Sequence, residues 1–108
     1  MSILDPKRTQ IYKVVGVSFS NDDGSSRQKY LSKVNKASDI SLKREPNNEF
    51  DSNAVAVYAN GKQVGYLGNH YASIIAPKLD AGEEFEIKIR DCGAYVDKFI
   101  LHIFINPK

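Results

Sequence analysis

Cysteine and histidine are scarce in this chain. It has one cysteine, Cys92, and two histidines, His70 and His102, among 108 residues. A single cysteine excludes a disulfide framework and a multi-cysteine zinc site within one chain, and it is typical of reducing compartments. The three side chains fall in different predicted elements, so they suggest neither a metal site nor a catalytic cysteine or histidine pair. We therefore expect no metal, no cofactor and no enzymatic activity.

Long apolar runs and a large charge of one sign are also absent. The first ten residues, MSILDPKRTQ, lack the apolar core of a signal peptide, and no stretch approaches the roughly eighteen apolar residues that span a bilayer. The net charge is only +2, far below that of a protein held to nucleic acid by bulk electrostatics. These features favour a cytoplasmic protein without a membrane partner.

The length and the composition predict one folded domain. A chain of 108 residues has enough material for a single modest core, and 42% hydrophobic and 26% charged residues are ordinary for a globular protein. We expect a single domain over residues 1–108, with its core in about residues 11–106.

The periodicity of the apolar residues predicts a mainly β fold. Branched, aromatic or alternating apolar stretches predict strands near residues 11–19, 38–44, 53–59, 62–67, 84–91 and 98–105. One-sided helical patterns predict short helices near 25–35 and 69–80. Asn60-Gly61 is the strongest hairpin signal. Because the short strands lack the spacing of parallel βαβ units, we expect a small, partly closed antiparallel β-barrel with two short α-helices.

Basic residues gather in one stretch of the chain, residues 27–44. Against a single acid, Asp39, this stretch has Arg27, Lys29, Lys33, Lys36, Lys43 and Arg44. Two interpretations stay open: a solvated helix face with its loop, or a positive surface that meets a partner.

The sequence EPNNEFDSNAV, residues 45–55, joins two predicted strands through a polar turn. It forms part of a longer pattern, R-[DE]-P-x-N-x-[YF]-D-x-N-A-[VI]-x-V followed by G-x-x-[VI]-G-[YH]-[IL], which is met between Arg44 and Leu67. In this pattern the chain resembles the HIRAN domain family. The resemblance extends over roughly residues 12–106.

The resemblance implies an OB-like barrel that captures the 3′ end of single-stranded DNA, with a role in DNA repair or processing. By residue correspondence, Asp51 would accept a hydrogen bond from the terminal 3′-hydroxyl. Phe50 would lie beside the end nucleotide, Phe19 would stack on a base, and Asn48 would lie near the bases. Tyr66 stands where the DNA-binding member has a histidine.

General physical chemistry agrees with these roles but also permits purely structural ones. Aromatic faces stack on any base, and a carboxylate is tolerated beside DNA only where no further phosphate follows. Alternatively, Asp51 and Asn48 close an Asx-type turn, Phe50 covers the mouth of the barrel and Phe19 belongs to the core.

The chain departs from the DNA-binding pattern at its phosphate contacts. Residues 68–70 replace a segment with phosphate-binding lysines, and Ser18 replaces an arginine. Arg27, Lys43 and Arg44 are the candidates that would compensate, although Arg27 equally fits an ion pair within the domain.

Two functions therefore remain open. The first is a module that binds single-stranded DNA ends. The second is an adaptor that binds a protein partner through the same groove or through the basic face of residues 27–44.

Overall fold

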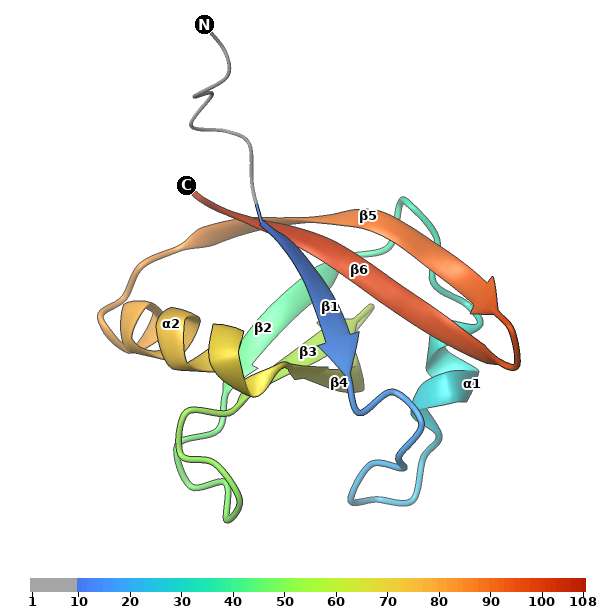
Figure 1. Cartoon of the computed structure of the whole chain (residues 1–108), viewed down its shortest axis with the longest axis horizontal. Coiled ribbons are helices and arrows are strands. Elements are labelled where there is room, and N and C mark those ends of the chain that lie inside the picture. The colour runs from blue at the N-terminus through green and yellow to red at the C-terminus, as the bar shows by residue number, and fades with distance from the viewer. Residues whose placement is uncertain (1–9) are drawn as a thin grey trace, which may run out of the picture.

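The computed structural model describes residues 10–108, and Figure 1 shows the order of its elements. The strands are β1 (Ile11–Val15), β2 (Ile40–Arg44), β3 (Val55–Ala59), β4 (Lys62–Leu67), β5 (Phe85–Tyr95) and β6 (Lys98–Pro107). The helices are α1 (Arg27–Leu31) and α2 (Asn69–Asp80). Every predicted strand and both predicted helices are present, with some changes of length.

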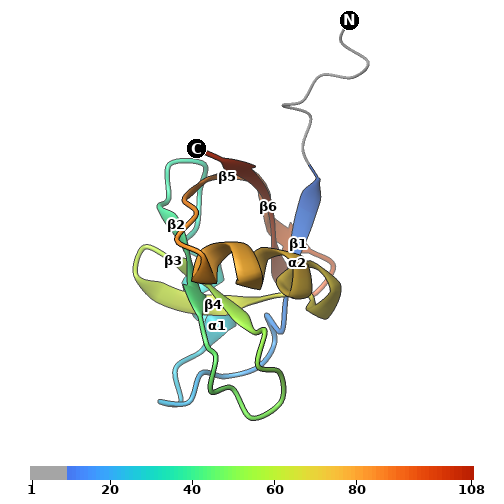
Figure 2. The same ribbon diagram turned by 90° about the vertical axis from the view of Figure 1, so that its left-hand side faces the viewer.

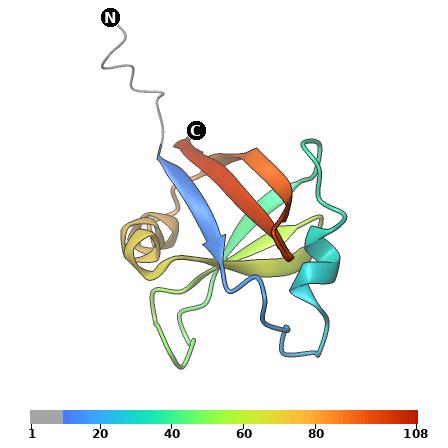
Figure 3. The same ribbon diagram turned by 45° about the vertical axis from the view of Figure 1, so that its right-hand side comes forward.

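The strands form one curled antiparallel sheet in the order β2-β3-β4-β1-β6-β5. Figure 3 shows β1, β5 and β6 facing β2, β3 and β4 across the interior, and the edge strands β2 and β5 approach one another. The fold is therefore a nearly closed barrel with two short helices, as predicted. The helix α2 packs beside β2 and β3 and faces the viewer in Figure 2, while α1 packs beside β4 and β6.

Aliphatic side chains fill the interior of the barrel. Val14, Val57, Val64, Leu101 and Ile103 come from four strands, and each is at most 1% exposed. Their alternation with outward-pointing residues follows from the two-residue repeat of a strand.

The hairpin between β3 and β4 fixes the position of β4. Asn60 and Gly61 have φ values of 51° and 82°, and two successive positive φ values are what a type I′ turn requires. The resulting register places Tyr66 of β4 opposite Ala56 of β3. Tyr66 thus lies close to the point where the turn of residues 45–54 enters β3.

Three element ends differ from the predictions by four residues each, and the other boundaries differ by less. The strand β1 ends at Val15 because Gly16 has a φ of 70°, which extended backbone does not allow. The helix α1 ends at Leu31, and β5 continues to Tyr95. Ser26 caps α1 by accepting a hydrogen bond from the backbone of Lys29 at 3.1 Å. Neither helix in the described residues has the length and apolar character needed to cross a membrane.

Candidate functional site

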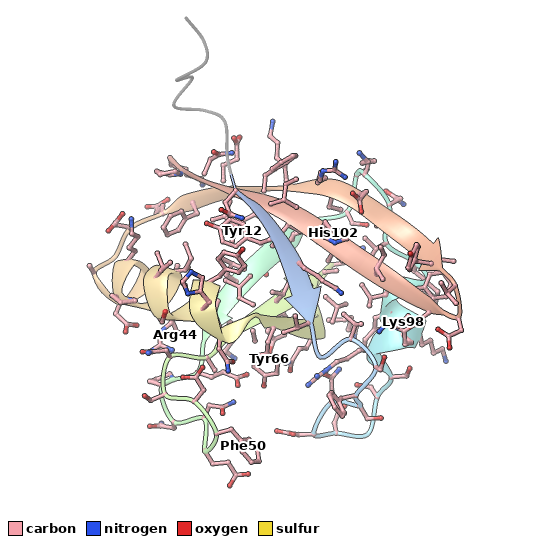
Figure 4. All side chains as sticks on the ribbon, in the orientation of Figure 1. Tyr12, Arg44, Phe50, Tyr66, Lys98 and His102 are labelled. Carbon is pink, nitrogen blue, oxygen red and sulfur yellow. The ribbon has the colours of Figure 1, made fainter. Side chains whose placement is uncertain are left out.

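A groove of about 1050 Å³ opens between two loops of the barrel, residues 16–26 and residues 45–54. Figure 4 shows Tyr66 between these loops and Phe50 near the tip of the second one. The predicted site residues that line the groove are Phe19, Arg27, Asn48, Phe50, Asp51 and Tyr66. The structure thus brings together most of the residues predicted for the site, from three separate parts of the chain.

The two phenylalanines of the groove are exposed to solvent. Phe19 is 71% exposed and Phe50 is 90% exposed. The possibility that Phe19 belongs to the core is therefore wrong, because β1 ends at Val15 and the following loop leaves the barrel. Two large apolar side chains at the rim of one polar groove are suited to contact a flat ligand.

Asn48 organises the second loop. Its Oδ1 accepts hydrogen bonds from the backbone N–H groups of Phe50, at 2.9 Å, and Asp51, at 3.0 Å. Its Nδ2 donates to Oε1 of Glu45 at 3.0 Å. These contacts match the Asx-turn alternative, so the amide of Asn48 is engaged in shaping the turn.

Asp51 has one carboxylate oxygen in the turn and one outside it. Its Oδ1 accepts a hydrogen bond from the backbone of Asn53 at 2.8 Å. No described residue donates to Oδ2, and no buried polar side-chain atom among the described residues lacks a partner. Oδ2 is therefore open to solvent, which allows Asp51 both to close the turn and to accept a hydrogen bond from a ligand.

Tyr66 connects the floor of the groove to the second loop. Its hydroxyl donates a hydrogen bond to Oε1 of Glu45 at 2.8 Å. Burial is the main cause that raises the pKa of Tyr66, and the hydrogen bond to the Glu45 carboxylate adds to it. The phenol is therefore protonated near neutral pH and remains a hydrogen-bond donor.

Arg27 is buried, so neither interpretation of the basic stretch, a solvated helix face or a positive surface, applies to this residue. Its side chain is 7% exposed, and Cζ lies 5.3 Å from the centroid of the Tyr66 ring. Nε donates to Oδ1 of Asn21 at 2.7 Å, and Nη1 donates to the carbonyl of Gly16 at 2.9 Å. An ion pair within the domain, one of the two alternatives for Arg27, is not among those of the described residues. The hydrogen bonds of its guanidinium instead stabilise the first loop, residues 16–26.

Arg44 and Lys43 lie outside the residues that line the groove. Arg44 donates to the carbonyls of Ala54, at 2.8 Å, and Ser52, at 3.0 Å, and forms an ion pair with Asp80 of α2 at 2.9 Å. It therefore fixes the base of the second loop. Lys43 lies over the ring of Tyr58, at 6.0 Å from the centroid.

The sequence interpretation missed the acidic character of the groove. Its lining contains one basic side chain, Arg27, together with four carboxylates, which belong to Asp22, Glu45, Glu49 and Asp51. The acidic position of the pattern R-[DE]-P pointed to Glu45, but no signal placed Asp22 or Glu49 at the same groove. Among residues 10–108, no group of three or more histidine, cysteine, aspartate or glutamate side chains is arranged to hold a metal ion.

Residues 7–102 match the family model of the HIRAN domain. The chain belongs to the HIRAN domain family. A stretch of 52 residues is 44% identical to the helicase-like transcription factor of Oryctolagus cuniculus and 40% identical to that of Mus musculus. This stretch is 47% of the present HIRAN chain but only 5% of the length of either relative.

Two solved structures share the fold. The HIRAN domain of human HLTF has a TM-score of 0.67 and 27% identity, over 91% of this chain and 75% of that one. A protein from Lactobacillus plantarum has a TM-score of 0.63 over 89% of this chain and 91% of its own, and at 19% identity it supports the fold alone.

Proposed function

We propose that this HIRAN domain binds single-stranded DNA at its 3′ end and thereby acts in DNA repair or processing, as a binding module without catalytic activity. The observation that carries the proposal is the combination of Phe19, Phe50 and the open Oδ2 of Asp51 along one groove. The family membership adds to it, because the HIRAN pattern is met at Phe50 and Asp51.

The exposed phenylalanines supply the sequence-independent part of the binding. Stacking of a base on an aromatic side chain contributes about 1–3 kcal/mol and does not require a particular base. Phe19 and Phe50 belong to opposite loops, so they are placed to contact a strand from two sides of the groove.

Asp51 supplies the preference for an end. A 3′-hydroxyl can donate a hydrogen bond to Oδ2, whereas an internal position or a 3′-phosphate places a negative charge beside the carboxylate. The position of Oδ1 in the turn holds the side chain in place for this contact. Recognition of the end is thus a difference between attraction and repulsion at one atom.

The test compares labelled single strands that differ only in a free or a phosphorylated 3′ end. Asp51→Ala is expected to weaken binding of the hydroxyl strand by about 1.5–3 kcal/mol, the range for hydrogen bonds to a charged group. Binding of the phosphorylated strand should stay the same or strengthen, because the repulsion by the carboxylate is removed. Asp51→Asn is the matched control for folding, since its amide oxygen still accepts from the backbone of Asn53. The affinity of the Asp51→Asn variant for the strand with a free 3′-hydroxyl should nevertheless fall.

Two outcomes would contradict the proposal. Equal losses on both strands would mean that Asp51 only builds the turn. Absence of binding by the native domain at low salt would favour the adaptor function instead.

The excess of carboxylates in the groove favours a second candidate, an adaptor that binds a basic segment of a protein partner. Glu49 distinguishes the two functions because it is exposed in the groove and no described residue pairs with it. Glu49→Gln should strengthen binding of DNA and weaken binding of a basic partner, each by less than about 1 kcal/mol for an exposed charge.

A further inference from the structure

Arg27 is a buried charge without an acidic partner. Its side chain is 7% exposed, and the ion pairs of the described residues do not include it. Removing a guanidinium from water is unfavourable, and neutral hydrogen-bond acceptors compensate for this only in part. An anion that enters the groove would bind strongly to this guanidinium, because the cost of removing the guanidinium from water has already been met on folding.

The guanidinium is held rigidly and still has donors to offer. Nε and Nη1 are bound to Asn21 and Gly16, and the plane lies by the ring of Tyr66. No described residue accepts a hydrogen bond from Nη2, and because no buried polar side-chain atom among the described residues lacks a partner, Nη2 keeps some contact with solvent. Because Arg27 lines the groove, this open donor belongs to the groove.

The other charged side chains of the groove disfavour the binding of a second anion. The carboxylates of Asp22, Glu45, Glu49 and Asp51 share the lining with this one cation. A second phosphate in the groove would meet these carboxylates without a basic side chain to offset them. The groove is therefore suited to a ligand segment with a single phosphate.

We infer that Arg27 binds the phosphate that joins the terminal nucleoside to the nucleotide before it, and that this is the only phosphate the groove binds. The ligand is then a terminal dinucleotide segment, whose length beyond two nucleotides adds little affinity. The inference rests on the proposed function and specifies which part of the strand the groove takes. The N–H groups of Nη2 can donate charge-assisted hydrogen bonds to an oxygen of a phosphodiester.

The experiment uses thymidine dinucleotides with a free 3′-hydroxyl, joined either by a phosphodiester or by an uncharged methylphosphonate, and measures binding by NMR titration. The native domain should prefer the charged dinucleotide by about tenfold or more, as for a hydrogen bond between charged groups. Arg27→Gln should abolish this preference. Lys43→Gln is the matched control, because it removes the same charge outside the groove and should leave the preference unchanged.

Several results would overturn the inference. An equal loss of affinity for both dinucleotides in Arg27→Gln would reduce Arg27 to a role in folding the first loop. An equal effect of Lys43→Gln would indicate bulk electrostatics in place of a specific contact.

The native domain provides a test that does not depend on the folding of a variant. The affinity for an eight-nucleotide strand should fall with salt with a logarithmic slope of about −0.7, the value for one phosphate on a single strand. A slope of about −2 or steeper would show that several phosphates are bound, and would contradict the inference.

The inference and the proposed function fail separately. A domain that prefers the phosphodiester but binds hydroxyl and phosphorylated 3′ ends equally would keep the role of Arg27 and lose the recognition of the end by Asp51. A domain that distinguishes the two ends but binds both dinucleotides equally would keep the recognition of the end and lose the role of Arg27.

Discussion

Tyr66 and Glu45 connect the sheet to the loop that forms one wall of the groove. The Tyr66 hydroxyl donates to Oε1 of Glu45 at 2.8 Å, and the same oxygen accepts a hydrogen bond from Nδ2 of Asn48 at 3.0 Å. A strand residue, a glutamate at the start of the turn and the asparagine that shapes the turn thus form one chain of hydrogen bonds. The shape of the groove depends on this chain.

Tyr66→Phe removes the first hydrogen bond of this chain without changing the ring. We expect a loss of about 1 kcal/mol in the free energy of unfolding, the usual value for one such bond, measured by urea denaturation. Tyr95→Phe is the control, because Tyr95 is 64% exposed and lies in β5. It should change stability by less than about 0.5 kcal/mol. Equal effects of the two substitutions would show that the Tyr66–Glu45 bond does not stabilise the fold.

Arg44 holds the second loop by its contacts to the backbone more than by its ion pair. Its side chain is 14% exposed, whereas that of Asp80 is 55% exposed, so solvent weakens the pair. Arg44→Gln should lower the free energy of unfolding by about 2–3 kcal/mol through the lost bonds to Ser52 and Ala54. Asp80→Asn should cost less than about 1 kcal/mol. A larger effect of Asp80→Asn in thermal or urea unfolding would reverse this ranking.

Local sequence signals predicted the parts of the site that depend on neighbouring residues. Asn60-Gly61 predicted the hairpin because a type I′ turn strongly prefers these two residues. The hairpin and the turn of residues 45–54 then brought Asp51 and Tyr66 to one groove. Asp51 and Tyr66 could be expected to lie close together because the turn, β3 and the hairpin connect them along the chain.

The parts of the site that depend on distant contacts could not be predicted. The burial of Arg27 is set by Gly16, Asn21 and Tyr66, and in the sequence Arg27 resembles the other basic residues of its stretch. Arg44 pairs with an aspartate 36 residues away. Charge patterns along a chain reveal a basic segment but not which of its members fold inward.

Gly65 lies where β4 passes close to β1. A Cβ atom at this position would lie 2.5 Å from the carbonyl oxygen of Val15 and 2.7 Å from Cγ1 of Val14. Gly65→Ala should therefore lower the free energy of unfolding by about 1–3 kcal/mol through overpacking. Gly68→Ala is the control, since the nearest atom to its Cβ would be Cδ2 of Tyr71 at 4.0 Å. If Gly65→Ala unfolds with the same free energy as the native domain, the close approach of β4 to β1 at Gly65 is contradicted.

We expect the free energy of unfolding of the barrel to depend on pH in the acidic range through Asp91. His102 donates a hydrogen bond from Nδ1 to Oδ1 of Asp91 at 2.8 Å, and this contact, helped by Arg90, lowers the pKa of Asp91 below its ordinary value of 3.8. A lowered pKa stabilises the folded state above the ordinary value, and this contribution is lost as the pH falls below it. Asp91→Asn should thus flatten the loss of stability below about pH 4, as measured by thermal unfolding. Asp97→Asn should retain the native pH profile, and an unchanged profile in Asp91→Asn would contradict the role of the pair.

A substitution at Phe50 can test binding without disturbing the fold, because this residue is 90% exposed. Phe50→Ala should change the free energy of unfolding by less than about 0.5 kcal/mol, since it removes no buried surface. If a base stacks on the ring, the same change should weaken binding of a single strand by about 1–3 kcal/mol, measured by fluorescence titration. Tyr95→Ala removes an exposed aromatic ring from the far hairpin of the barrel and should leave the affinity unchanged. Equal losses from both substitutions would indicate non-specific contact with the aromatic surface, and no loss from Phe50→Ala would exclude stacking at the tip of the loop.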